Sequence, residues 1–110
     1  MDLLLDAIAK AESRDNPESV GDSGRAVGVY QIHRSYWVDG TRILGVRWDY
    51  REAHDPQKAR QVVRAYLSHY GKGKPPLDRA RIHNGGPKGD QKEATLAYAR
   101  KVEQILNGDA

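Results

Sequence analysis

Three stretches of the chain place apolar residues at the spacing of an amphipathic α-helix. The first covers residues 2–12, the second begins at Asp55-Pro56 and ends before Gly71, and the third runs over residues 92–106. The second has the longest apolar stripe, whose members fall at i, i+3, i+4, i+7, i+8 and i+11: Ala59, Val62, Val63, Tyr66, Leu67 and Tyr70. Such positions share one helix face, and Asp followed by Pro is typical of a helix start. The pattern therefore predicts three helices that bury one face each.

The remaining residues form short elements and turns. Residues 71–76 are a loop rich in Gly, Lys and Pro, and residues 78–83 are expected to form a short helix. Residues 13–27 are rich in turn-forming residues, and a short β-hairpin is predicted between Val20 and Val27. The chain shows no internal repeat, so we expect a mainly α (α+β) fold: one helical-bundle domain over residues 1–110, with a short hairpin near residues 20–27.

Composition removes several classes of function. The 110 residues include no cysteine, which excludes disulfides and cysteine-based zinc sites. No apolar stretch approaches the ~20 residues of a membrane span, so no membrane association is expected. No signal peptide is evident at the N-terminus, although a removed one or another delivery route stays open.

The net charge of +3 favours polyanions such as nucleic acid or the bacterial wall. Nucleic acid is not expected as a partner, because Lys58, Arg60 and Arg64 are spread around the outside of their helix.

Glu12 interrupts the apolar face of the first predicted helix. Leu5, Ile8 and Glu12 fall at i, i+3 and i+7, so the acid shares the side that should meet the core. A carboxylic acid held against apolar neighbours retains its proton more readily, which a general acid requires. The alternative is that the helix ends at Glu12 and the side chain turns into solvent.

Four segments of the chain together resemble a known group of proteins. They are Glu12-Ser13, Gly28 to Ile32, Tyr36 to Asp39, and the run Ala80-Arg81-Ile82-His83-Asn84-Gly85-Gly86-Pro87. They resemble the lysozyme-like superfamily, most closely the invertebrate-type lysozymes and more distantly the soluble lytic transglycosylases. The last of these segments is the most specific, and the resemblance covers nearly the whole chain in the same order. Invertebrate-type lysozymes are rich in disulfides, whereas Val27 and Gly40 stand where that family has cysteine. This departure points to a cysteine-free bacterial or phage-like member.

The resemblance implies two catalytic carboxylates. Glu12 matches the general acid. The second carboxylate of the family lies about seven residues before the glycine that corresponds to Gly28, and Asp22 lies six residues before it, so one gap is needed. The Gly-rich segment tolerates such a gap. The alternative is that Asp22 is a turn residue that hydrogen-bonds its own backbone beside Gly24.

The resemblance also implies residues that contact substrate. We expect them to be Tyr30, Gln31, His83, Asn84 and Gly85. For the first two, the alternative is a helix start in which Tyr30 and Ile32 pack inside; for the others it is an ordinary left-handed turn. Trp37 and Trp48 are expected to anchor the core.

No metal or cofactor is expected. His33, His54 and His69 lack the spacing of paired metal ligands on a helix, and no strand-turn-helix unit surrounds the glycines at 21, 24 and 28.

The resemblance implies a muramidase that hydrolyses the β-1,4 bond between N-acetylmuramic acid and N-acetylglucosamine. Its partner would be the glycan strands of peptidoglycan, and the protein would act as a monomer outside the cell or in the periplasm. A lytic transglycosylase would cut the same bond with Glu12 alone and form 1,6-anhydro-muramic products. A wall-binding module without activity would have no need of a buried acid.

Overall fold

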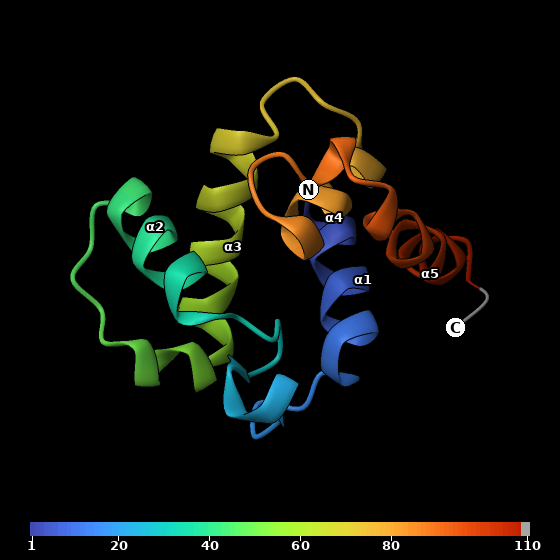
Figure 1. The fold of residues 1–110 in the computed structure, drawn as a ribbon. Coiled ribbons are helices and arrows are strands. Elements are labelled where there is room, and N and C mark those ends of the chain that lie inside the picture. The colour runs from blue at the N-terminus through green and yellow to red at the C-terminus, as the bar shows by residue number, and fades with distance from the viewer. Residues whose placement is uncertain (109–110) are drawn as a thin grey trace.

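The computed structural model describes residues 1–108, which form a helical domain with one small two-stranded sheet (Figure 1). The α-helices are α1 (Asp2–Ser13), α2 (Arg34–Leu44), α3 (Pro56–Tyr70), α4 (Pro76–Gly85) and α5 (Leu96–Leu106). The strands are β1 (Val20–Gly21) and β2 (Ala26–Val27), and the 3₁₀ turns are η1 (Asp22–Gly24), η2 (Tyr50–His54), η3 (Gly89–Gln91) and η4 (Glu93–Thr95). The prediction of a mainly α fold with a short hairpin is confirmed. No helix among residues 1–108 is long and apolar enough to cross a membrane.

The predicted helices form close to their expected bounds. Helix α3 begins where expected, because the Asp55 side chain accepts hydrogen bonds from the backbone N–H groups of Gln57 and Lys58. The helix expected from Lys92 starts four residues later, since residues 93–95 form the separate turn η4. The hairpin pairs Val20 with Val27 in antiparallel register, and η1 connects its strands. Asp22, at the start of η1, is thereby placed at the tip of the hairpin.

Helix α2 is the element that the hydrophobic pattern did not predict. It packs against α3 and buries Trp37, whose indole N–H donates to the Trp48 carbonyl at 2.9 Å. Gly40 permits the close approach of the two helices, because a Cβ there would lie 2.5 Å from Cγ1 of Val62. The expectation that Trp37 anchors the core is confirmed, while Trp48 is only partly buried against it.

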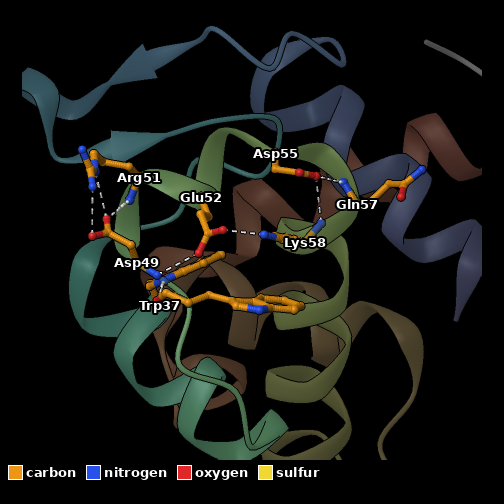
Figure 2. Close-up of polar contacts among 8 residues, drawn as sticks. Trp37, Asp49, Arg51, Glu52, Asp55, Gln57 and Lys58 are labelled. Carbon is orange, nitrogen blue, oxygen red and sulfur yellow. Dashed lines mark hydrogen bonds and ion pairs between the residues drawn. The ribbon is translucent and has the colours of Figure 1, made fainter.

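Polar contacts fix the corner where η2 meets α3 (Figure 2). Asp49 caps η2 by accepting from the Arg51 backbone, and the Glu52 side chain accepts from the Asp49 backbone in return. Glu52 also forms an ion pair with Lys58 in α3. Because Ala53 lies inside this capped turn and contacts the chain at Gly28, the corner supports the segment that leads into the hairpin.

The core lies between α1, α3 and α4, with α2 and α5 at opposite sides of the molecule (Figure 1). Helix α5 packs against both α1 and α4. Lys101 of α5 donates to the Ala11 carbonyl at 2.7 Å, which satisfies one of the free carbonyls in the last turn of α1. This arrangement holds the end of α1, where Glu12 lies, against two other helices.

Candidate active site

An open cleft of about 570 Å³ runs between the end of α1, the hairpin, α2 and the end of α4. The residues that line it include Glu12, Asp22, Gln31, His33, Ser35, Tyr36, Asp39, Tyr66, His83 and Asn84. Both predicted carboxylates therefore face the same cleft, although they come from different elements.

Glu12 lies in the last turn of α1 with its side chain only 19% exposed. Its Oε2 accepts a hydrogen bond from the Tyr98 hydroxyl at 3.1 Å and lies 3.1 Å from Nε2 of His83. The expectation of apolar surroundings is only partly correct, because polar groups from α4 and α5 hold the carboxylate. The adjacent Ser13 donates to the Val29 carbonyl at 2.7 Å, which ties the end of α1 to the segment that carries Gln31.

His83 contacts Glu12 in the wall of the cleft. Its side chain is 2% exposed, and Nε2 lies 3.0 Å from the Tyr30 carbonyl as well as 3.1 Å from Glu12. Both neighbours are acceptors, so Nε2 must carry a hydrogen. In the neutral ring Nδ1 then accepts from the Tyr36 hydroxyl at 2.9 Å. With both nitrogens engaged inside the protein, His83 orients the catalytic candidate, although the sequence suggested a sugar contact.

Tyr98 and Tyr36 stay protonated at neutral pH. Burial, the negative charge of Glu12 and the hydrogen bond to it raise the pKa of Tyr98 well above its usual value. Burial, followed by the neighbouring Tyr66, Tyr98 and Glu12, raises the pKa of Tyr36 in the same direction. Each hydroxyl therefore keeps its hydrogen at neutral pH and can donate it: Tyr98 donates to Glu12, and Tyr36 donates to His83.

Replacing Tyr98 with Phe is expected to lower kcat for glycan cleavage about threefold to tenfold and to change KM little. The substitution removes the hydroxyl that fixes Glu12 and leaves the ring in place, so the loss corresponds to about one ordinary hydrogen bond. Steady-state kinetics on soluble wall fragments measure the two constants separately. The matched control is Tyr30→Phe, whose hydroxyl contacts Arg60 outside the cleft, and it should leave both constants unchanged. An unchanged kcat in Tyr98→Phe would contradict the positioning role.

Asp22 lies at the tip of the hairpin in the left-handed backbone region, with φ of 49°. Its backbone carbonyl closes the turn by accepting from the Arg25 N–H at 3.1 Å. The carboxylate lies 3.2 Å from Nε2 of His33 and 3.7 Å from the Arg25 guanidinium, and it is half exposed. Asp22 is therefore both a turn residue and a carboxylate that faces the cleft, since the backbone does the turn's hydrogen bonding.

The other predicted contact residues have different positions. Asn84 is exposed on the cleft wall. Gln31 lines the cleft too, but its amide nitrogen donates to the carbonyls of Ser19 and Gly28 at 3.2 and 3.0 Å, which leaves only its oxygen free to accept. Tyr30 lies in the core, as the alternative interpretation held, and only its carbonyl reaches His83. Gly85 faces Thr95, because a Cβ there would lie 2.6 Å from Cγ2 of that residue.

Several cleft residues were not selected from the sequence. Tyr36 stacks on Tyr66 with ring centroids 3.7 Å apart, and Asp39 lies one turn along α2. Burial acts to raise the pKa of Asp39, but hydrogen bonds from Tyr70 and Arg42 outweigh it and lower that pKa overall. Tyr36 and Asp39 share one helix face at i and i+3, so a helix prediction over residues 34–44 would have placed them together. Among residues 1–108, no group of three or more His, Asp or Glu side chains is arranged to hold a metal ion.

A helical domain in which Glu12 and Asp22 face one open cleft in different surroundings has the features of a glycosidase. The family model described as Destabilase matches residues 2–105. The chain is 39% identical to a lysozyme of Ostrea edulis over 93% of this chain and 78% of that protein. It is 35% identical to invertebrate-type lysozyme 6 of Caenorhabditis elegans, over 92% and 83%. The fold matches a chain in a crystal structure of Aeromonas hydrophila PliI in complex with Meretrix lusoria lysozyme, with a TM-score of 0.82 and 31% sequence identity. The match covers 96% of this chain and 89% of that chain.

The chain therefore belongs to the Destabilase family, that of the invertebrate-type lysozymes. It is a lysozyme-type glycoside hydrolase, and the family suggested by the sequence motifs is confirmed.

Proposed function

We propose that this protein hydrolyses the β-1,4 bond between N-acetylmuramic acid and N-acetylglucosamine in peptidoglycan, with Glu12 as general acid and Asp22 as second carboxylate. The observation that carries the proposal is that both carboxylates line one cleft in different surroundings. Glu12 is largely covered and held by Tyr98 and His83, whereas Asp22 is half exposed beside two basic side chains. Such a difference in surroundings supports the proposal that Glu12 is the acid and Asp22 the anion.

In this mechanism Glu12 protonates the glycosidic oxygen of the departing sugar. Glycan bound in the cleft would remove the remaining water from Glu12, and lost hydration favours the acid that carries the proton. Asp22 supplies negative charge to the oxocarbenium-like carbon, either by stabilising it or by trapping it. Water then adds to this carbon and gives a proton to the Glu12 carboxylate, which restores the acid. Tyr98 and His83 hold Glu12 in one orientation. Little conformational entropy is therefore lost when the carboxyl group is aligned with the glycosidic oxygen.

The rest of the cleft would recognise the sugars. Asn84 presents both a donor and an acceptor on the wall opposite the hairpin, which suits an N-acetyl group. The free amide oxygen of Gln31 could accept from an acetamido N–H. We extend the proposal to a single catalytic domain that works as a monomer on glycan strands outside the cytoplasm. The net charge of +3 favours approach to an anionic wall.

Replacing Asp22 with Asn is expected to slow hydrolysis about a hundredfold, since an amide supplies no negative charge to the reacting carbon. Mass spectrometry of fragments released from purified peptidoglycan measures both the rate and the chemistry. Fragments with ordinary reducing ends from the wild type support hydrolysis.

Other outcomes would point to the alternatives. Fragments lighter by one water, ending in 1,6-anhydro-muramic acid and released equally by Asp22→Asn, would indicate a lytic transglycosylase that needs Glu12 alone. Negligible release by the wild type would contradict the enzyme proposal on this substrate and favour a wall-binding module.

A further inference from the structure

A second, smaller pocket adjoins the cleft beside the hairpin. It has a volume of about 300 Å³ and is lined by Gly24, Arg25, His33, Arg34, Ser35 and Tyr50. His33 and Ser35 line both this pocket and the catalytic cleft, so the two hollows meet at these residues. A ligand bound along the cleft could therefore extend a side branch into the second pocket.

The pocket is lined by basic side chains, and one of them, Arg34, is not neutralised by a carboxylate within residues 1–108. The Arg34 guanidinium lies over the ring of Tyr50, with its carbon 4.7 Å from the ring centre, which holds the cation in place. Within residues 1–108, no carboxylate forms an ion pair with Arg34. The nearby Asp49 is occupied by Arg51, and Asp22 is shared between Arg25 and His33. The pocket thus keeps a net positive charge with an oriented guanidinium in its wall.

We propose that this pocket binds a carboxylate on the branch of the glycan that carries the peptide, and the proposal rests on the function proposed above. The sugar backbone of peptidoglycan is neutral. Its carboxylates lie on the attached peptide, or on the lactyl group of muramic acid where no peptide is attached, because the peptide is joined through an amide to that lactyl carboxyl. That branch leaves every second sugar, so a glycan lying in the cleft presents one close to the bond being cut. A planar guanidinium matches a carboxylate through two parallel hydrogen bonds.

The site would discriminate between two polymers with the same β-1,4 backbone. Chitin-type chains of N-acetylglucosamine lack the carboxylate and would leave Arg34 without a partner. Muramyl chains would gain a charge-assisted contact. The pocket would therefore give the enzyme a preference for wall glycan, which the catalytic carboxylates alone do not provide.

The test compares two forms of one substrate. Peptidoglycan stripped of teichoic acid is used either as purified or after its carboxylates have been converted to amides. Release of reducing ends gives kcat/KM for each form, and their ratio is measured for the wild type, for Arg34→Gln and for Arg47→Gln. Arg47 is an exposed arginine outside both pockets and is the matched control. Because a ratio is used, a partly unfolded variant would lose activity on both forms and leave the ratio unaltered.

We expect the wild type to prefer the native form, and Arg34→Gln to reduce that preference about fivefold to tenfold. Arg47→Gln should retain it. An unchanged ratio in Arg34→Gln, or an equal fall in Arg47→Gln, would overturn the carboxylate site and leave the catalytic proposal standing. If the wild type released nothing from either form, the proposed function and the pocket's role would both fail.

Discussion

Replacing Glu12 with Gln is expected to reduce the rate of peptidoglycan cleavage about a thousandfold while the fold stays intact. Gln has nearly the same shape, but its amide cannot deliver a proton to the departing oxygen, and general acid catalysis contributes about 10²–10⁴-fold. The amide oxygen can still accept from Tyr98 and His83, which now donate to the carboxylate. Release of reducing ends measures the rate, and urea unfolding measures the stability.

The matched control is Glu18→Gln, which removes a carboxylate from an exposed position in the loop after α1. It should retain full activity, because Glu18 is outside the cleft. If Glu12→Gln stayed within tenfold of the wild type while folded, Glu12 could not be the proton donor. A second acid in the cleft, Asp22 or Asp39, would then have to be tested for that role.

The sequence alone predicted the parts of the site that depend on local pattern. The position of Glu12 in the last turn of α1 follows from the i, i+3, i+7 spacing, and the cap at Asp55 places α3 to the residue. The hairpin was expected from its turn residues, and with it Asp22 at the tip. These features depend on neighbours within a few positions, which periodicity and capping describe well.

Helix α2 could not be predicted from the hydrophobic pattern, because its stability comes from packing against other elements. It contains Gly40 and several aromatic or β-branched residues, all of which are weak helix formers in isolation. Contact with α3 compensates, since Trp37 is fully buried and Gly40 lets Val62 approach closely. The cleft residues that α2 carries, Tyr36 and Asp39, could not be placed without the helix.

The partners of Glu12 could not be predicted either, because they are remote in sequence. Tyr98 is 86 residues away from Glu12, and the pair forms only when α5 docks against α1. The direction of the Tyr30 side chain could not be predicted for a related reason. Gln31 adopts φ of 50°, and the side chain of Tyr30 lies in the core with its hydroxyl on Arg60. A linear motif identifies such residues as important and does not indicate which way they face.

Replacing Gly28 with Ala is expected to lower the free energy of unfolding by about 3 kcal/mol and the melting temperature by roughly 10–20 °C. Gly28 has φ of 81°, and a Cβ there would lie 2.2 Å from the Ala53 carbonyl oxygen. Its own carbonyl accepts from both the backbone and the side chain of Gln31, so the residue cannot shift without loosening the cleft wall. Urea and thermal unfolding measure the loss.

The matched variant is Gly24→Ala, at the other glycine of the hairpin region with a similar backbone angle. Its φ is 89°, but a Cβ there meets no atom within 4 Å, so the change should cost only about 1 kcal/mol for the unfavourable backbone conformation. The difference between the two variants isolates the clash with Ala53. Equal losses would mean that the η2 corner yields to the added methyl group and that backbone conformation alone requires glycine at Gly28. A larger loss at Gly28 would show that the capped corner is rigid and that it fixes the segment from which Gln31 enters the cleft.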